Sequence, residues 1–393
     1  MWPVDSYRDS LFETVTLNQR QLQVATRPAL RETTGVSVSE QLLAAEAMLT
    51  PGQRVLVAPC GQGALAGWAA GVVGAPGVLA VDTSAIALEL TRATLAANGL
   101  GDAMIAIAAA SCGEGQYDVG LMMLPKGRTL ARMHLLNMAL ALKPGAELYL
   151  AGAKDEGIKS VLGDAATLLG TGQLLAYRKG HRVARFVRPE LDLAHLPEPF
   201  AVPGLLPGTY STYDVEWHGR HLTVCSRPGV FSHGELDPGT AMLLAHLRAR
   251  RDDRVLDWGC GSGVIGLVAA LQAPPETVTL LDVDALACEC AVATLAANSV
   301  SGARVVHGDG LAALAGERYS LIVSNPPFHS GRAVNLKLTA ALIAEARDAL
   351  LPRGRLLLVA NRFLPYDHLL RDRFASVETV AQDSYYRVLE VVR

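Results

Sequence analysis

The sequence predicts an α/β protein in which one doubly wound, mostly parallel sheet occurs twice. Its 393 residues are enough for two domains of ordinary size. The second half repeats the first at a shift of 200 residues, and apolar runs alternate with helical segments inside each copy. Apolar strands that alternate with helices pair in parallel and are covered on both faces, which favours this class over an all-β or all-α fold.

The internal repeat is clearest around two glycine-rich segments. Residues 55–63 (VLVAPCGQG) align with residues 255–263 (VLDWGCGSG), and the stretch TLAAN occurs at both 94–98 and 294–298. A register kept over about 100 residues is hard to obtain by chance, so we interpret the chain as one fold written twice.

The second copy shows the order of its elements most clearly. His218-Gly219 lies between two alternating segments, 213–217 and 221–226, which predicts a β-hairpin. After the hairpin we expect, in order, a strand at 254–257, a helix at 264–272, a strand at 277–281, a helix at 285–298, and strands at 304–307 and 321–324.

Domain boundaries follow from the repeat and from proline content. We expect a first domain over residues 1–195 and a second over residues 213–393. The stretch 196–212 between them contains four prolines and is interpreted as a linker.

Composition excludes several classes of protein. The net charge is -3, with 35 Lys and Arg against 38 Asp and Glu, so any nucleic acid must be held by a local patch rather than by bulk charge. Six cysteines without a CxxC motif indicate reduced thiols of a cytoplasmic protein, without a metal site. Residues 55–81 lack charge, but repeated Gly and Pro argue against a membrane span there.

Glycines and acids of the second copy predict a nucleotide site. Gly259, Gly261 and Gly263 follow a strand and precede a helix, where they allow a tight turn and a close approach of backbone to ligand. Three acids end three successive strands of the same crevice: Asp257, Asp282 and Asp309. They could meet an ammonium group, the ribose hydroxyls and an adenine amino group, respectively. The pattern GxGxxG at 261–266 leaves nicotinamide binding open at this point.

The tetrapeptide Asn325-Pro326-Pro327-Phe328 decides between these chemistries. Its prolines remove two N–H donors, and Asn325 adds a side-chain acceptor oxygen. The amino group of a base can donate one hydrogen to Asn325 and one to the Pro326 carbonyl, while Phe328 stacks on the ring. Hydride transfer has no use for such an arrangement, whereas group transfer to an amino nitrogen needs this alignment.

These motifs resemble those of class I S-adenosylmethionine-dependent methyltransferases, whose domains are Rossmann-like. The closest resemblance is to the ribosomal RNA guanine-N2 methyltransferases, small-subunit enzyme C and large-subunit enzyme G. It is carried by residues 227–240 (RPGVFSHGELDPGT), 324–329 (SNPPFH), 359–365 (VANRFLP) and, in the first copy, 151–160 (AGAKDEGIKS).

The resemblance implies a reaction and further site residues. It implies methyl transfer from S-adenosylmethionine to N2 of an rRNA guanine, with S-adenosylhomocysteine as product. It also implies that Phe231, Asp237 and Thr240 lie near the methionine end of the cofactor. His329 is shared with the family but has a structural role as readily as a catalytic one. Stretches around Phe231 and Tyr366 are nearer the small-subunit branch, so we expect 16S rRNA, bound by a cytoplasmic monomer.

The first copy lacks some of the candidate site residues of the second copy. Val57 stands for Asp257, and Met123-Leu-Pro-Lys126 stands for the Asn-Pro-Pro-Phe tetrapeptide, although Asp82 survives. We therefore expect this copy to bind RNA and not the cofactor. Phosphate contacts are expected from a basic cluster that contains no acid: Arg178, Lys179, Arg182, Arg185 and Arg188.

Other functions remain possible from the residues alone. The same reaction on 23S rRNA, or N-methylation of a protein glutamine or a DNA adenine, could use the same tetrapeptide, although the last two families favour Tyr in place of Phe328. A non-enzymatic RNA-binding assembly factor would need both copies to be inactive.

Overall fold

The computed structural model describes residues 8–27, 35–107, 113–326, 332–363 and 366–393. The chain divides into two compact units. The C-terminal unit contains Ser211–Arg393, together with Arg8, Asp9 and Arg27, and the N-terminal unit contains Ser10–Thr26 and Thr33–Tyr210. Each unit is described by itself below.

The observed division departs from the expected boundaries in two places. Most of the stretch expected as a linker, up to Tyr210, belongs to the N-terminal unit. Phe200 and Leu205 within it are buried, because a chain that carries large apolar side chains gains free energy by packing them. In addition, Arg27 belongs to the C-terminal unit, although the strand that ends just before it, at Thr26, belongs to the N-terminal unit.

Strands and helices alternate through the C-terminal unit as the sequence predicts. Its elements are β10 (Ser211–Trp217), β11 (Arg220–Ser226), α6 (Pro238–His246), β12 (Val255–Trp258), α7 (Val264–Ala270), β13 (Val278–Asp282), α8 (Ala285–Ala297), β14 (Arg304–His307), β15 (Tyr319–Ser324), α9 (Arg332–Ala349), β16 (Leu350–Asn361), α10 (Tyr366–Arg371), β17 (Ser376–Gln382) and β18 (Tyr386–Val392).

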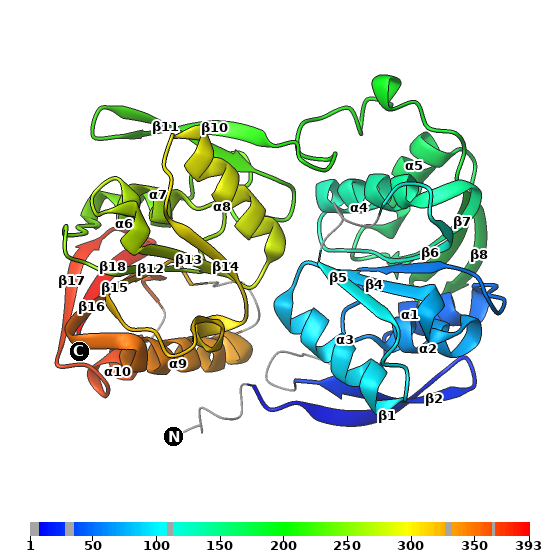
Figure 1. Ribbon diagram of the computed structural model, residues 1–393, viewed down its shortest axis with the longest axis horizontal. Helices are drawn as coiled ribbons and strands as arrows, with labels where there is room; N and C mark the ends of the chain where they lie inside the picture. Colours follow the sequence, from blue (N-terminus) through cyan, green and yellow to red (C-terminus); the bar gives the residue numbers. More distant parts are fainter. Residues whose placement is uncertain (1–7, 28–34, 108–112, 327–331, 364–365) are drawn as a thin grey trace. The chain divides into compact units, whose positions relative to one another are not determined.

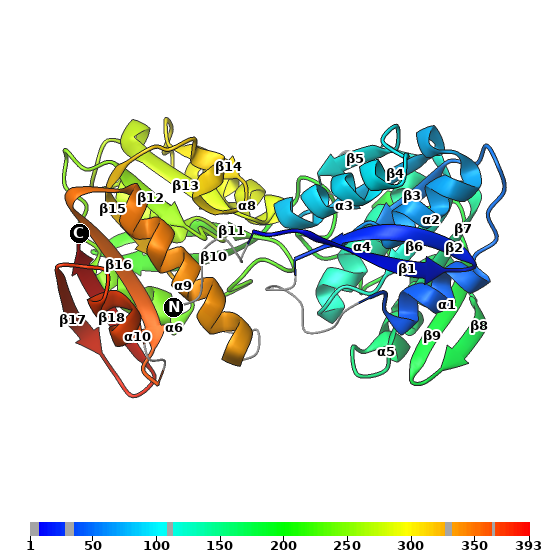
Figure 2. The same cartoon turned by 90° about the horizontal axis from the view of Figure 1, so that it is seen from below.

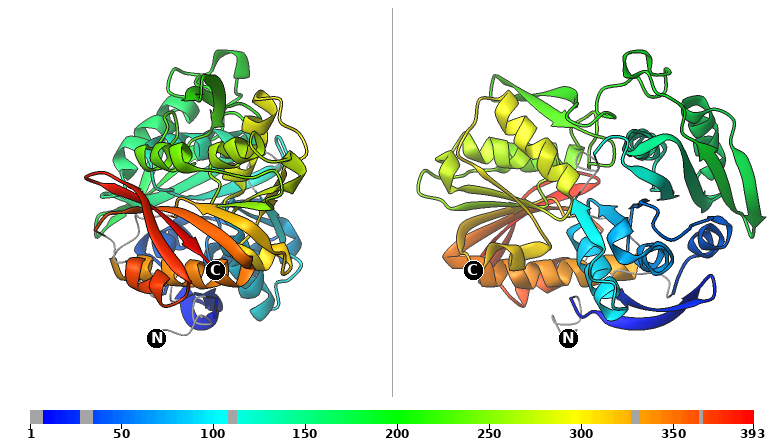
Figure 3. Two further views of the ribbon diagram at one scale, coloured as in Figure 1. Left: turned by 90° about the vertical axis from the view of Figure 1, so that its left-hand side faces the viewer. Right: turned by 45° about the vertical axis from the view of Figure 1, so that its right-hand side comes forward.

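The sheet of this unit has the strand order β14-β13-β12-β15-β16-β18-β17 within the described residues. The first five strands pair in parallel, and β18 and β17 complete the sheet in antiparallel pairing beside β16 (Figure 3). Helices α6, α7 and α8 cover one face, and α9 and α10 cover the other (Figure 1). The expected doubly wound α/β class is therefore confirmed.

The N-terminal unit repeats this layout, including the strand order β5-β4-β3-β6-β7-β9-β8 (Figure 2). Its elements are β1 (Leu11–Leu17), β2 (Arg20–Thr26), α1 (Val38–Glu46), β3 (Val55–Ala58), α2 (Ala64–Val73), β4 (Val78–Asp82), α3 (Ala85–Ala97), β5 (Met104–Ile107), β6 (Tyr117–Met123), α4 (Arg128–Ala141), β7 (Leu142–Ala153), α5 (Ile158–Leu169), β8 (Gln173–Arg178) and β9 (His181–Val187).

The duplication extends to a hairpin that the sequence analysis placed only in the second copy. In the C-terminal unit the Asn298 side chain accepts from Thr223 N (3.1 Å) and donates to Thr223 O (2.7 Å), so the end of α8 is joined to β11. In the N-terminal unit Asn98 makes the same two bonds to Gln23, at 3.0 and 2.8 Å. The recurring TLAAN stretch was the sequence signal for this attachment, because a polar Asn at the end of an apolar helix requires a partner.

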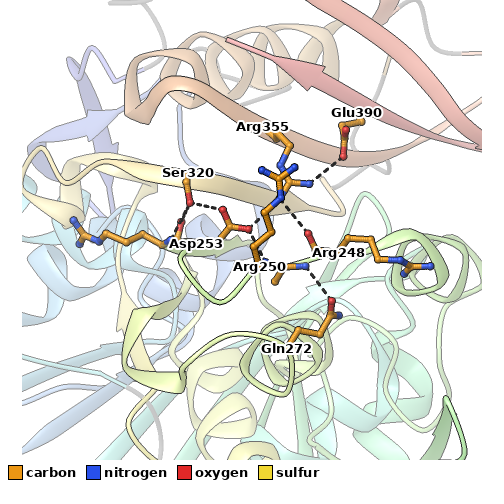
Figure 4. A network of polar contacts seen from close by, with 9 residues as sticks. Arg248, Arg250, Asp253, Gln272, Ser320, Arg355 and Glu390 are labelled. Atoms are coloured by element: carbon orange, nitrogen blue, oxygen red, sulfur yellow. Dashed lines mark hydrogen bonds and ion pairs between the residues drawn. The ribbon is translucent and has the colours of Figure 1, made fainter.

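A buried ion pair holds the amino ends of the central strands of the C-terminal unit (Figure 4). Asp253, just before β12, accepts from Ser320 Oγ (2.7 Å) on β15 and from Arg355 Nη2 (3.0 Å) on β16. The Arg355 guanidinium also reaches Glu390 on β18 at 3.5 Å. These contacts join β12, β15, β16 and β18 at one edge of the sheet, where the three parallel strands begin and the antiparallel β18 ends.

Asp253→Ala should lower the free energy of unfolding of the C-terminal unit by about 3 kcal/mol, because a mostly buried arginine loses the nearer of its two carboxylate partners. Urea denaturation measures the loss, and hydrogen exchange locates it in β12 and β15. The exposed pair Arg347–Asp348 provides the control, and Asp348→Ala should change stability by less than about 0.5 kcal/mol. If both substitutions changed the free energy of unfolding equally, the network of Figure 4 would contribute no more to stability than an exposed ion pair.

Candidate active site

The candidate site lies at the carboxyl edge of the C-terminal sheet. Strand β12 is paired in parallel with β13 on one side and with β15 on the other, so all three strands end at the same edge. The glycine loop after β12, Asp282 at the end of β13, and Asn325 after β15 are thereby brought together. This is the edge at which open α/β sheets bind ligands.

Asp257 lies beneath the glycine loop and is completely buried. Its Oδ2 accepts from Gly266 N at 2.7 Å, near the beginning of α7, while its Oδ1 is a buried oxygen without a partner among the described residues. Burial raises the pKa of Asp257 to about 7, and the nearby Asp282 adds to the increase, although the bond from Gly266 opposes it. A buried carboxylate with one free oxygen is suited to a cationic group of a ligand.

The glycine loop leaves open space on the ligand side and packs tightly on the other. Gly259 and Gly261 have positive φ, and a Cβ at either would meet nothing within 4 Å. Gly263 also has positive φ (+83°), but a Cβ there would lie 2.8 Å from Ala291 Cα. The loop therefore needs glycine at 263 so that α8 can approach, whereas the other two glycines leave room for a ligand beside backbone N–H groups.

Asp282 is fixed by backbone donors in the way that a ribose-binding acid requires. Its Oδ2 accepts from Gly261 N (2.8 Å) and its Oδ1 from Asp284 N (3.0 Å). Burial raises its pKa, and these two bonds oppose the increase. Each carboxylate oxygen keeps a further lone pair, so the pair of oxygens can accept from two neighbouring hydroxyl groups.

The carboxamide of Asn325 has a defined orientation. Its Nδ2 donates to Thr240 Oγ1 (2.8 Å) and to Asp237 Oδ2 (3.1 Å), and Asp237 itself caps α6 through Thr240 N (2.7 Å). Both amide hydrogens are thus bound by α6, and Asn325 Oδ1 is buried without a partner among the described residues. A fixed, unused acceptor is the group that an incoming amino group would need.

The other residues expected at the site have varied surroundings. Phe231 is about half exposed on the loop that leads to α6, and Pro326 is buried. Pro327, Phe328 and His329 lie outside the described residues. The structure thus brings Asp237 and Thr240 to Asn325, a contact that the sequence alone did not reveal.

Asp309 makes ionic contacts that the sequence analysis missed. Its Oδ2 is 2.6 Å from Nη1 of Arg27, whose side chain is buried, and 3.7 Å from Nε of Arg8. Arg8 also pairs with Glu345 at 2.8 Å. Arg27 aligns with Arg227 of the second copy, and this was its only sequence signal, because a contact between residues 282 positions apart has no local pattern.

The N-terminal unit keeps one part of this site and lacks the rest. Asp82 accepts from Gly61 N (3.0 Å) and Ser84 N (3.0 Å), as Asp282 does from its own neighbours. Val57 at the end of β3 supplies no carboxylate, and Met123 ends β6 where the Asn-bearing loop begins in the other copy. The acid therefore also serves as a turn residue, whether or not a ligand is bound.

Some residues of the basic cluster in the N-terminal unit are engaged in contacts within that unit, and others are exposed. Arg185 pairs with Glu147 at 2.8 Å, and Arg188 donates to Ala139 O at 2.9 Å. Arg182 lies over the ring of Tyr177, whereas Arg178 and Lys179 are exposed at the turn between β8 and β9. Binding of RNA by this cluster stays a prediction, and the exposed turn is the part best placed for it.

The described cysteines and helices add two observations. Cys60, Cys225, Cys260, Cys288 and Cys290 are free thiols, and the described residues hold no group of His, Cys, Asp and Glu suited to a metal ion. Within the same residues, no helix has the length and apolar character needed to cross a membrane.

Comparisons with known proteins identify the family of this chain. A family model described as methyltransferase small domain matches residues 221–390, and one described as methyltransferase small domain N-terminal matches residues 83–170. Ribosomal RNA small subunit methyltransferase C of Pseudomonas entomophila (strain L48) is 38% identical over 70% of this chain and 80% of its own. Its counterpart in Pseudomonas aeruginosa (strain UCBPP-PA14) is 37% identical over 71% and 80%.

A solved structure matches the whole chain. The T. thermophilus 16S rRNA N2 G1207 methyltransferase in complex with AdoMet and guanosine has a TM-score of 0.78 and 27% identity, with all of both chains covered. The fold and the site thus define a class I S-adenosylmethionine-dependent methyltransferase. More particularly, the chain belongs to the ribosomal RNA small subunit methyltransferase C family, and the resemblance found in the sequence is confirmed.

The two equivalent acids allow a matched test of which unit binds the cofactor. Asp282→Asn should weaken binding of S-adenosylmethionine about 10- to 100-fold, because charge-assisted hydrogen bonds to hydroxyl groups are lost. Asp82→Asn removes the same carboxylate from the N-terminal unit and should leave the affinity unchanged. Isothermal titration should give one site per chain. Two sites, or equal losses in both variants, would contradict the assignment.

Proposed function

We propose that this chain transfers a methyl group from S-adenosylmethionine to the N2 amino group of a guanine in 16S rRNA, leaving S-adenosylhomocysteine. The observation that carries the proposal is the Asn325 carboxamide at the edge of the sheet. Its nitrogen is bound by Asp237 and Thr240 of α6, and its buried oxygen has no partner among the residues that the structure describes. The relatives named above are small-subunit enzymes, which supports 16S over 23S rRNA.

The cofactor site is assembled from the glycine loop and two acids. Asp257 Oδ1 would face the ammonium group, Asp282 would accept from the ribose hydroxyls, and Gly259 and Gly261 give the space these contacts need. When bound, the cofactor supplies an electrophilic methyl group on its sulfonium. The chain itself provides negative charge beneath a positively charged ligand.

The acceptor nitrogen is aligned by oxygen acceptors. One hydrogen of the amino group would bond to Asn325 Oδ1 and the other to the Pro326 carbonyl, so that the nitrogen lone pair points toward the methyl group. Fixing the amide nitrogen on Asp237 and Thr240 prevents the carboxamide from presenting its own donors. Alignment can supply several kcal/mol of the barrier reduction, so no strong base is required. Once methylated, the nitrogen is cationic and acidic, and it releases one proton to solvent.

The nucleotide must leave its stack to reach this site. The N2 amino group of a base-paired guanine lies in the minor groove, and an enzyme that acts on it extrudes the nucleotide or takes it from a single strand. We propose that the N-terminal unit holds the surrounding RNA, with Arg178 and Lys179 as phosphate contacts. We also propose that the enzyme works as a cytoplasmic monomer on the small ribosomal subunit or its RNA.

Asn325→Ala should lower methyl transfer to 16S rRNA about 100-fold or more, because the aligned acceptor is lost. Incorporation of labelled methyl, followed by nucleoside analysis for N2-methylguanosine, measures it. Thr240→Val keeps Asn325 but removes one acceptor for its amide, so a smaller loss is expected. Full activity of Asn325→Ala would rule out this alignment mechanism.

Binding of the cofactor should weaken as the pH falls below about 7. In the free protein the raised pKa of Asp257 means that its carboxyl gains a proton in this range, and only the ionised form attracts an ammonium group. The dissociation constant should therefore increase by up to about tenfold per pH unit below pH 7 and level off above it. Asp257→Asn should bind more weakly and show a flat profile. If that variant kept the pH profile of the wild-type protein, Asp257 would not be the residue that binds the ammonium group.

A further inference from the structure

Two large aromatic side chains stand in solvent at the carboxyl edge of the C-terminal sheet. Phe363 follows the end of β16 and is 73% exposed, and Tyr385 precedes β18 and is 72% exposed. Their backbones are adjacent, since Arg362 N donates to Tyr385 O at 2.8 Å. An exposed aromatic ring contributes nothing to the core, so a pair of them in neighbouring turns calls for another explanation.

These turns are continuous with the active site. Asn361 at the end of β16 pairs with Tyr386 at the beginning of β18. A Cβ on Gly239 would lie 3.1 Å from the Tyr386 ring, so that ring packs against the first turn of α6. Burial, together with the Asp237 and Asp383 carboxylates, raises the pKa of Tyr386, consistent with this location. The two exposed rings therefore border the structure that orients Asn325.

The turn that carries Tyr385 is closed by hydrogen bonds to Asp383. Asp383 Oδ1 accepts from Tyr385 N and Tyr386 N, both at 2.7 Å, and Arg362 Nη1 donates to Asp383 O at 3.3 Å. These backbone bonds hold the pKa of Asp383 below its usual value. A ring on a fixed turn loses little conformational freedom when a ligand stacks on it.

The equivalent turns of the N-terminal unit differ in chemistry. There Lys154 N donates to Gly180 O at 2.9 Å, which is the counterpart of the Arg362–Tyr385 bond. Asp155 and Gly180 occupy the positions that correspond to Phe363 and Tyr385. The exposed side chains near these turns are charged or aromatic: Lys154, Asp155, Glu156, Arg178, Lys179 and Tyr177. The pair of rings thus occurs in the copy that has the Asn325 site, and an acid and a glycine occupy the two positions in the copy that lacks it.

We propose that Phe363 and Tyr385 form a stacking platform for unpaired nucleotides adjacent to the target guanine. The proposal rests on the proposed function and adds the state of the substrate: the strand beside the target is single-stranded where it meets the enzyme. Aromatic rings stack on any base, so the platform would hold the flanking strand with little sequence preference. The exposed Arg362 directly precedes Phe363, and its backbone N–H is bonded to Tyr385 O, so its side chain would reach a phosphate of the same strand.

The platform also fits the charge of the protein. Around these turns the positive charge of Arg362 is offset by Asp383, and the whole chain has a net charge of -3. The net charge of the protein therefore attracts the RNA backbone only weakly, and base stacking supplies affinity that does not depend on net charge.

Substitution of either ring should raise KM for RNA without changing kcat or the affinity for S-adenosylmethionine. We expect about a tenfold increase in KM for Phe363→Ala and for Tyr385→Ala with 16S rRNA. Phe363→Trp and Tyr385→Phe keep a ring and should retain the wild-type KM. Phe363→Leu keeps apolar surface without a ring and should behave like the alanine variant. Phe12→Ala, which removes an exposed ring from β1 of the N-terminal unit, is the matched control.

A double-mutant cycle separates stacking from a structural effect. Binding of a hexaribonucleotide with one central guanosine is compared with analogues that lack one flanking base but keep its phosphate. If the rings stack on flanking bases, Phe363→Ala or Tyr385→Ala should cause no further loss once the contacted base is absent. Additive losses at every flanking position, an unchanged KM, or a fully active Phe363→Leu would overturn the proposal. Wild-type protein that methylates no rRNA would instead refute the proposed function itself.

Discussion

The parallel pairing of β12 with β13 and β15 is the constraint on which the rest of the C-terminal unit depends. Parallel strands end at one edge, so the glycine loop, Asp282 and Asn325 meet there although up to 66 positions separate them in the chain. The opposite edge is held by the buried contacts of Asp253 with Ser320 and Arg355. The supporting contacts thus lie at one end of the strands and the candidate site at the other.

A single amide orientation links this framework to the reaction. Helix α6 holds the Asn325 nitrogen through Asp237 and Thr240, and the cap of the helix uses the same Asp237 oxygen. The Asp237 carboxylate therefore both stabilises the first turn of α6 and orients the carboxamide of Asn325. The same helix start packs against Tyr386, which connects the orienting contacts to the proposed stacking platform.

The two copies show which contacts serve folding and which serve chemistry. Both keep the Asn side chain that joins helix to hairpin, Asn98 in one and Asn298 in the other. Both also keep an acid that accepts from the glycine loop. Only the C-terminal copy has a carboxylate at the end of its first central strand and an asparagine after the fourth. The contact that joins helix to hairpin and the acid below the glycine loop are thus shared by both copies, whereas the groups assigned to the ammonium group and to the acceptor amine are present in one.

The sequence by itself determined the α/β class, the duplication, the order of elements and the candidate acids, because these follow from local patterns of apolar residues, glycines and strand ends. It placed the segment 304–307 as the structure does and other elements within about two residues. It missed the N-terminal hairpin and the antiparallel strands β17 and β18, whose places depend on long-range pairing. Only the tertiary structure decided that Arg27 reaches Asp309 and that Asp237 orients Asn325. The physical reason is that a contact between distant residues depends on how strands are registered and helices packed, which no local pattern in the chain specifies.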